Sequence, residues 1–411
     1  MKKRLLSLIT IMVVTFSLLG CSNNAPTKEG SPSPTTEASV SPSTEPSKTE
    51  APAASESPAV SEVPEESPMP MKDIKSVEFE KNLHIGWNLG NTLDASGGIG
   101  LDTETAWGNP VTTKEMIMAV KEAGFDTLRL PTTWGNHMLD KEPYTIHQIW
   151  LDRVKEVVDY GIDNGMYVIL NLHHEEWLYP DYENLPMLKT RLAAMWTQIA
   201  ETFKNYDEHL IFEGMNEPRL RGTPLEWTGG DEESRDVINQ LNQVFVDTIR
   251  SSGGNNPLRQ IMVPTYAASP NPTALSTFVV PQDDHLIVSL HSYTPYNFAL
   301  NTKGTSEFDK DSDQDKNELD WLFNTINDTF ISKGIPVILG EFGAVNKENL
   351  QDRIEWAKEY TSRASSIGVP CVYWDNGAFS GEGENFGLID RKTLTWAYPE
   401  IVNSLMEGLQ K

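Results

Sequence analysis

The sequence is poor in cysteine, in basic residues and in long apolar runs. Its 411 residues include two cysteines, Cys21 and Cys371, and only Cys371 falls in the part expected to fold, which excludes an intramolecular disulfide there. It has 33 Lys and Arg against 59 Asp and Glu, for a formal net charge of −26. Such an acidic protein repels nucleic acid and anionic lipid, so a neutral partner fits better.

The apolar run near the N-terminus is too short to cross a membrane. It extends from Leu5 to Leu19 after three basic residues, roughly 15 residues where a span needs about 20. This layout predicts a signal peptide over residues 1–20. The stretch LLGC is similar to a bacterial lipoprotein signal, in which Cys21 receives lipid; the alternative is an ordinary secretory signal with an incidental cysteine. The protein is therefore expected on the extracellular face of the bacterial membrane, where only this anchor touches lipid, or secreted.

Residues 22–70 lack aromatic side chains and apolar periodicity. They are almost entirely Ser, Pro, Thr, Glu and Ala, a composition that buries too little surface to offset the entropy lost on ordering. We therefore expect residues 21–70 to form a disordered linker. Residues 71–411, which contain no internal repeat, are expected to form one folded domain.

This domain has eight short apolar runs separated by helical patterns. The runs lie at 83–88, 125–131, 166–174, 209–218, 259–266, 285–293, 335–343 and 369–377. The helical patterns lie at 112–124, 150–165, 188–205, 235–252, 316–333, 349–367 and 396–408. The first helical pattern is expected to open with a capping box, Thr112 with Glu115. Near-continuous apolar runs are typical of parallel strands buried on both faces, and their alternation with helices predicts an α/β fold, a (β/α)₈ TIM barrel, over a doubly wound sheet.

Two glutamates follow apolar runs of this predicted barrel. Glu217 lies at the end of the fourth run and Glu341 at the end of the seventh. Barrel enzymes assemble their sites at the carboxyl ends of the strands, and strands three apart in a ring of eight face each other across the mouth. Two facing carboxylates are typical of a glycosidase, in which one is kept protonated and the other ionised. The alternative is that each glutamate caps a helix.

Motifs for metals and other cofactors are weaker. His173, His174 and the two glutamates after them lack the H-E-x-x-H spacing, and neighbours on a strand point to opposite faces. The acidic run at 309–320 resembles a calcium loop, but Lys316 stands where the turn needs glycine and Leu322 where a bidentate glutamate belongs. We expect no cofactor and no catalytic metal, and we expect the acidic run to cap a helix that begins near residue 316.

Eight motifs, in order, carry a resemblance to a known family. They are GWNLGNTLDA, ETAWGNP, LRLP, LNLHHE, FEGMNEPR, HSYTPYNFA, GEFG and YWDNG. Together they resemble glycoside hydrolase family 5, the retaining cellulases, especially its endoglucanases and xyloglucanases, over roughly residues 75–408. The resemblance implies that Glu217 is the acid/base and Glu341 the nucleophile. The substrate-binding positions expected are Asn88, Arg129, His173, His174, Asn216, His291, Tyr293 and Trp374, with the loop residues Trp177 and Trp227 as sugar platforms.

Physical roles follow for these positions. Arg129 and Tyr293 are expected to orient Glu341 and keep it ionised, and His291 is expected beside Glu217. Asn216 is expected to bond the sugar 2-hydroxyl, and the ring of Trp374 to stack on the sugar. In a retaining enzyme the two carboxyl groups lie about 5–5.5 Å apart.

The expected protein is a monomeric, retaining endo-β-1,4-glucanase acting on β-glucan polysaccharide. The alternatives are a xyloglucan-specific or mixed-linkage endoglucanase, a β-mannanase, or a non-catalytic glycan-binding surface protein.

Overall fold

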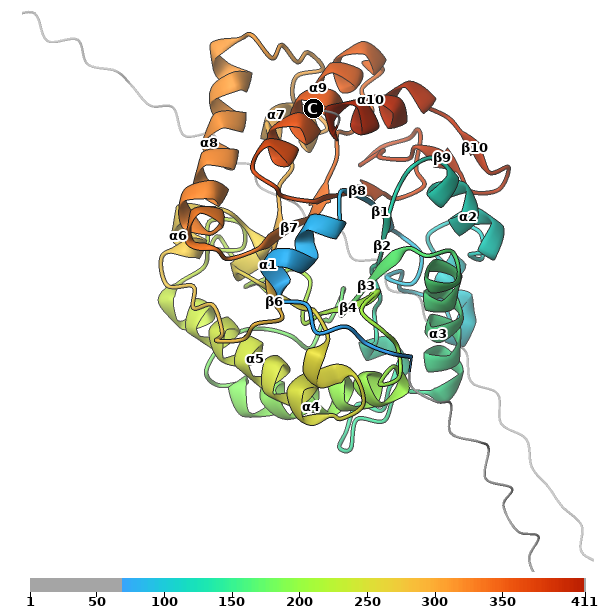
Figure 1. Cartoon of the computed structure of the whole chain (residues 1–411), viewed down its shortest axis with the longest axis vertical. Coiled ribbons are helices and arrows are strands. Elements are labelled where there is room, and N and C mark those ends of the chain that lie inside the picture. Colours follow the sequence, from blue (N-terminus) through green and yellow to red (C-terminus); the bar gives the residue numbers. More distant parts are fainter. Residues whose placement is uncertain (1–68, 410–411) are drawn as a thin grey trace, which may run out of the picture. The chain divides into compact units, whose positions relative to one another are not determined.

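The computed structural model describes residues 69–409, and these contain a closed barrel of eight parallel strands (Figure 1). The strands are β1 (Ile85–Leu89), β2 (Thr127–Leu130), β3 (Tyr167–Asn171), β4 (Leu210–Glu213), β5 (Ile261–Pro264), β6 (Leu286–His291), β7 (Val337–Phe342) and β8 (Cys371–Asp375). They pair in chain order, and β8 closes the ring on β1. All eight expected strands and the (β/α)₈ fold are confirmed. The expected signal peptide, Cys21 and nearly all of the expected linker lie outside the described residues.

Helices surround the ring at the expected positions. The long ones are α2 (Lys114–Glu122), α3 (Gln148–Asp163), α4 (Leu185–Thr202), α5 (Glu232–Ser251), α8 (Asp313–Thr329), α9 (Leu350–Ser366) and α10 (Pro399–Leu409). Sequence periodicity missed the single-turn helices α1 (Ser76–Phe79), α6 (Pro272–Leu275) and α7 (Tyr296–Ala299), and the two-residue strands β9 (Ile389–Asp390) and β10 (Thr395–Trp396). No helix within residues 69–409 is both long and apolar enough to cross a membrane.

The start of α2 differs from the expected capping box. The hydroxyl oxygen of Thr113 accepts the Met116 amide at 3.3 Å, so Thr113 is the N-cap. The preceding Thr112 is buried, and its amide donates to Glu104 Oε1 at 2.8 Å. The prediction of Thr112 as the cap is therefore wrong. The Glu104 carboxylate accepts the Thr112 amide and keeps Thr112 in the loop before the helix. The acidic run at 309–320 was expected to cap a helix, and this is confirmed. Ser312 is the N-cap of α8, and acidic residues occupy the first turn of that helix.

The barrel interior has two layers of opposite chemistry. The lower layer is apolar and consists of Ile169, Ile211, Met262, Ile287, Ile338 and Val372, closed by Phe79 and Leu83 from the α1 segment. In Figure 1, α1 lies over the ring of strands. Two residues further along their strands, Asn171, Glu213 and Ser289 are equally buried and polar. We call these residues, with Asn88 and Arg129, the upper layer.

Strand β7 carries an irregularity next to this upper layer. Leu339 pairs with Leu290, but Glu341 pairs with the next residue, His291, so Gly340 is an extra residue in β7. Ile338 packs inside the barrel, whereas Leu339 and Phe342 pack in the core between strands and helices. A bulge of this kind re-aims the side chain that follows it, and here it turns Glu341 inward. A Cβ at Gly340 would lie 3.0 Å from His291 Nε2, so the close approach favours glycine.

The described chain contacts the barrel from its first residue. The Met69 amide donates to the Asn205 carbonyl at 2.9 Å, and Asn255 Nδ2 donates to the Met69 carbonyl at 2.9 Å. These contacts lie two residues before Met71, the expected start of the domain. At the other end of the fold, Cys371 in β8 is buried and free.

Candidate active site

Two carboxylates meet at the mouth of the barrel. Glu341 comes from the bulged end of β7, and Glu217 lies on the loop four residues after β4 ends. One oxygen of each carboxylate and one ring nitrogen of His291 all lie within 4.8 Å of one another. The expected approach of the two glutamates is therefore confirmed, and it favours the short carboxyl separation of retaining glycosidases over the wider one of inverting glycosidases.

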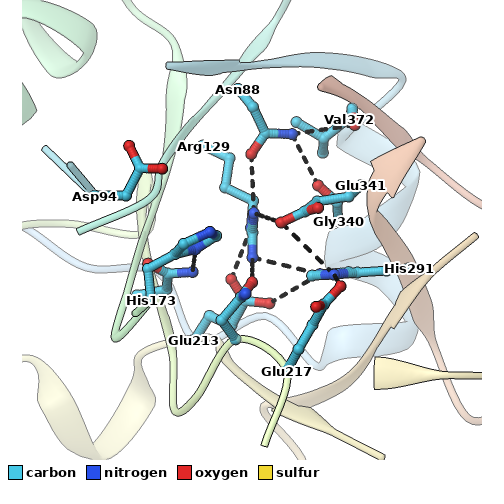
Figure 2. A network of polar contacts seen from close by, with 12 residues as sticks. Asn88, Asp94, Arg129, His173, Glu213, Glu217, His291, Gly340, Glu341 and Val372 are labelled. Atoms are coloured by element: carbon cyan, nitrogen blue, oxygen red, sulfur yellow. Dashed lines mark hydrogen bonds and ion pairs between the residues drawn. The ribbon is translucent and has the colours of Figure 1, made fainter. Parts of the chain in front are cut away.

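Arg129 joins the groups beneath and around these carboxylates (Figure 2). Its Nη1 donates to Glu341 Oε1 at 2.9 Å, and its Nε donates to Glu213 Oε2 at 2.8 Å. Nη1 also donates to Asn88 Oδ1 at 2.9 Å, and Nη2 donates to Asn216 Oδ1 at 2.7 Å. Arg129 is fully buried, and burial, which disfavours its charge, is outweighed by Glu213 and Glu341, so its pKa is raised. The guanidinium is therefore a permanent positive charge between two anions.

Glu341 receives a second donor from Tyr293. The phenol donates to Glu341 Oε2 at 2.8 Å, on the carboxylate oxygen that Arg129 does not hold. Burial, and next the charge of Glu341, raise the pKa of Tyr293 well above its usual range, so the phenol keeps its proton. Glu341 is thus held from both oxygens, as expected from the sequence.

Glu217 has a titratable partner instead. His291 Nδ1 lies 2.9 Å from Glu217 Oε1, and Arg219 Nη1 lies 3.4 Å from Oε2. Burial acts to raise the pKa of Glu217, but His291, and then Arg219 and Arg129, outweigh it and lower the pKa. Burial acts against the charge of His291, yet the carboxylates of Glu341, Glu213 and Glu217 raise its pKa to about 9. The Glu217–His291 pair therefore holds one proton at neutral pH.

Asn88 and Arg129 do not reach the cleft. Both side chains are 0% exposed. The Asn88 amide donates to the carbonyls of Gly340 and Val372 at 2.9 and 3.2 Å, and its oxygen accepts from Arg129. The prediction that these two residues bind substrate directly is therefore wrong. They lie one layer below the cleft and position the groups that line it.

His173 and His174 lie together, contrary to the expectation that they point to opposite faces. Strand β3 ends at Asn171, so strand alternation no longer applies, and the two rings lie 4.5 Å apart, edge to face. Their nitrogens and an oxygen of buried Asp94 lie within 4.8 Å of one another. However, Asn171 Nδ2 lies 3.1 Å from His173 Nδ1, and an amide nitrogen donates. Burial lowers the pKa of His173, so its neutral ring carries the proton on Nε2, which suits a donor better than a metal ligand.

The pocket beside Glu217 is lined by His173, His174, Asn216 and Arg219, among others. Trp374 stacks parallel on His173, with ring centroids 5.7 Å apart. Trp107, which is 42% exposed, lies 5.6 Å from the ring of His174 and extends this aromatic row. Trp107, which belongs to the motif ETAWGNP, also lies in a loop after a strand, but Trp177 and Trp227 were the loop tryptophans expected as platforms.

The two loop tryptophans expected as platforms differ. Trp227 is 60% exposed, and the Arg219 guanidinium lies 4.3 Å from its ring centroid. Trp177 is half-buried, with the Arg191 guanidinium 4.9 Å from its ring and its indole N–H donating to Glu175. Trp227 therefore offers more free aromatic surface than Trp177.

Sequence reasoning also missed Glu213. It is the fourth residue of β4, its side chain is fully buried, and it holds Arg129 from below. The available signal was a charged residue inside an otherwise apolar run, two positions after Ile211 and hence on the same face of the strand.

Comparisons with known proteins agree with this geometry. The family model described as Cellulase (glycosyl hydrolase family 5) matches residues 93–380. The chain is 54% identical to Endoglucanase B of Neocallimastix patriciarum over 349 residues, which cover 82% of this chain and 73% of that protein.

Two solved structures are also similar. A broad-specificity GH5-4 endoglucanase from Ruminococcus champanellensis with bound cellotriose is 51% identical, with a TM-score of 0.80 over 82% of this chain and 100% of that one. A family 5 lichenase variant from Caldicellulosiruptor sp. F32, in complex with cellotetraose, is 44% identical, with a TM-score of 0.79 over 84% of this chain and 98% of that one.

Proposed function

This chain belongs to the cellulases of glycosyl hydrolase family 5, and from that premise we propose that it is a retaining endo-β-1,4-glucanase with Glu341 as nucleophile and Glu217 as acid/base. The observation that carries the assignment is the approach of the two carboxylates within 4.8 Å, with different partners on each. Glu341 is held by a permanent cation and a phenol, which favours an ionised nucleophile. Glu217 is paired with His291, which can take up and return a proton.

Hydrolysis then proceeds in two displacements. In the first, Glu341 attacks the anomeric carbon, the glycosidic bond breaks, and the leaving oxygen takes the proton held by the Glu217–His291 pair. In the second, Glu217 removes a proton from water, the water oxygen bonds to the anomeric carbon, and the bond to Glu341 breaks. Arg129 and Tyr293 keep Glu341 oriented through both steps. Because both displacements invert the anomeric carbon, the product retains its configuration.

The proposed substrate is a neutral β-glucan chain that passes across the mouth. Trp374 and the His173–His174–Trp107 row supply rings next to the pocket, and Trp227 supplies a ring beside Arg219, which contacts Glu217. Several aromatic side chains near the acid/base suit a chain of sugars that extends beyond the reacting one, which supports an internal cut. The relative named a lichenase supports including mixed-linkage glucan among the substrates. A reducing-sugar assay on cellulose, mixed-linkage glucan, xyloglucan and mannan ranks these polymers.

The assignment of roles is tested with two variants. Glu341→Ala should lose turnover by about 10⁴-fold or more on all substrates. Glu217→Ala should lose comparable activity on polymer but keep much of it on an aryl glycoside whose leaving group needs no protonation. Glu176→Ala, at an exposed carboxylate in the loop after β3, is the control and should behave as wild type. Equal losses for both glutamate variants on the aryl glycoside would contradict the assignment.

We also propose that the chain is exported and anchored through a lipid on Cys21, with residues 22–70 as spacer. The apolar run followed by LLGC supports this proposal, and polymeric glucan is accessible only outside the cell. Two acyl chains provide stable attachment, whereas one is marginal. Cys21→Ser should move the protein from the membrane fraction to the medium or leave it unprocessed. Persistence of that variant in washed membranes would contradict the anchor.

A further inference from the structure

A third carboxylate lies directly beneath the two at the mouth. Glu213 Oε2 accepts from Arg129 Nε at 2.8 Å, and Oε1 accepts from the Ser289 hydroxyl at 2.6 Å. His291 Nε2 lies 3.9 Å from Oε1 (Figure 2). The side chain is 0% exposed and cannot touch a sugar. Since Arg129 contacts Glu341, and His291 contacts Glu217, Glu213 is one residue removed from each carboxylate of the pair.

We propose that Glu213 is a positioning residue for hydrolysis, whose negative charge sets the charge of the buried cluster around the reacting sugar. It acts through Arg129 and His291. The proposal rests on the roles proposed above for Glu217 and Glu341.

The charges of the cluster can be counted from its contacts. The groups that face His291 are Arg129 from β2, His173 after β3, Glu213 from β4, Glu217 from the loop after β4, and Glu341 from β7. His173 is neutral, and the Glu217–His291 pair is neutral overall while it holds its proton. One cation and two anions remain, for a net charge of −1, and Glu213 supplies the excess anion. Arg219, which contacts Glu217 from the loop side, does not change this sum because it is paired with Glu226 at 3.1 Å. Without it, Arg129 would simply neutralise Glu341.

This excess charge matters in the transition state. The reacting sugar gains positive charge as the glycosidic bond breaks. A fixed negative charge in a site screened from water stabilises that change without reorganisation. Glu213 therefore lets Arg129 hold Glu341 in place without cancelling the field of the nucleophile.

The same charge keeps the proton on the Glu217–His291 pair. Burial acts to raise the pKa of Glu213, but Arg129 and His291 outweigh it and lower the pKa to about 2, so Glu213 stays ionised. Glu213 is in turn one of the three carboxylates that raise the pKa of His291 to about 9. Removing its charge should release the proton of the pair at lower pH.

Glu213→Gln tests the charge with little change of shape, because the amide oxygen still accepts from Arg129. We expect kcat to fall about tenfold or more, and the alkaline limb of the kcat/KM profile to move about one pH unit lower. Glu213→Asp keeps the charge, so its alkaline limb should stay near that of wild type even where kcat falls. Glu104→Gln is the matched control. Glu104 is a buried partner of Arg153 at 2.8 Å and has no contact with the cluster, so its loss should lower stability without moving the limb.

A second measurement does not depend on turnover. Nitrogen NMR of the His291 ring in wild type should show two protonated nitrogens at pH 7.5, and Glu213→Gln should titrate at lower pH. A neutral His291 ring in wild type, an unmoved limb in Glu213→Gln, or equal shifts for Gln and Asp would overturn the proposal. If Glu213→Gln does not fold, the Asp profile and the wild-type NMR decide. Because NMR reads the proton directly, wrong roles for Glu217 and Glu341 would show in the kinetics and leave this result standing.

Discussion

The lower and upper layers of the barrel interior are built by the same strands and are chemically opposite. Within three strands the change takes two residues, from Ile169 to Asn171, from Ile211 to Glu213 and from Ile287 to Ser289. The lower layer gains free energy by removing apolar surface from water, about 1.5–3 kcal/mol for each fully buried aliphatic side chain. The upper layer takes charges out of water, which costs several kcal/mol per ion before pairing.

The two layers have different tasks, although they lie only two residues apart along the strands. The apolar layer stabilises the ring and needs no particular chemistry. The polar layer contributes little net stability, but it holds Glu341 in a defined orientation through Arg129. Damage to the two layers should therefore appear in different measurements.

The largest effect is expected for Arg129→Met, which leaves Glu213 as a buried charge without its cation. Breaking a buried ion pair from one side costs about 3–5 kcal/mol, and we expect that loss in the free energy of unfolding measured with urea. We also expect kcat to fall by about 10³-fold, because Glu341 loses its main donor.

Arg153→Met is the control for this variant. Arg153 pairs with buried Glu104 outside the barrel interior, at 2.8 Å. It should lose stability to a similar extent while keeping kcat. Equal kcat losses for the two arginine variants would contradict the claim that Arg129 affects catalysis beyond its contribution to stability.

The next effect is expected for Ile211→Ala in the lower layer. Truncating a fully buried isoleucine leaves a cavity and lowers the free energy of unfolding by about 2–4 kcal/mol. The kcat at a temperature well below the unfolding midpoint should stay within about twofold of wild type. A tenfold loss of kcat with an unchanged fold would show that the two layers are coupled.

A comparable effect is expected from pH, and it should come from Glu213 in the upper layer and from His291, which lies next to it. The pKa of His291 is raised to about 9 in the folded state, so its stabilising contribution is full below about 6.5 and is lost as pH rises toward 9. The pKa of Glu213 is lowered to about 2, so its contribution is full above about 4.5 and is lost as pH falls toward 2. Each change is about 3 kcal/mol, because the two pKa values of each group differ by about 2.5 and each pH unit between them corresponds to about 1.4 kcal/mol. Thermal unfolding from pH 2 to 9 measures both, and Ile211→Ala should shift the curve downward without changing its shape.

The smallest effect on the fold is expected for Trp227→Ala. This ring is exposed and contacts Arg219 outside both layers. Its loss should change the free energy of unfolding by less than about 0.5 kcal/mol. The KM for long glucan chains should rise several-fold, while kcat on a short aryl glycoside stays near wild type. An unchanged KM on polymer would exclude Trp227 as a sugar platform.

Much of the fold could be predicted because each strand is an isolated apolar run. The position of Glu217 and Glu341 at the mouth followed from the same runs, since parallel strands in a barrel present their carboxyl ends at one face. The contacts of Glu341 with Arg129 and Tyr293, and of Glu217 with His291, were also expected and are present.

The sequence did not predict how deep Asn88 and Arg129 lie in the barrel. Asn88 and Arg129 stand on strands, like Glu341, but the tilt and stagger of the barrel place them one layer lower. That offset is a property of the closed ring, which no single strand encodes. Glu213 was missed for a different reason, because its charge within an apolar run was a signal in the sequence that was overlooked.

Local geometry accounts for the remaining errors. The prediction for His173 and His174 assumed that β3 continues, but the strand ends at Asn171. The choice between Thr112 and Thr113 as the cap of α2 depends on Glu104, which lies eight residues before Thr112 and accepts its amide. Such competition between a local cap and a buried carboxylate is decided only when the loops pack.

The bulge at Gly340 in β7 determines whether the side chain of Glu341 points into the barrel or out toward the helices. Side chains alternate along a strand, so an insertion of one residue exchanges inside and outside for everything that follows. If β7 instead paired regularly through Gly340, with no bulge, Glu341 would be the third residue after Ile338 and would point at the helices, while Phe342 would turn toward the mouth. The chain would keep every chemical group of its site and lose the arrangement. For anyone transplanting the β7 segment with Gly340 to another barrel, the bulge is therefore as much a part of the catalyst as its glutamate.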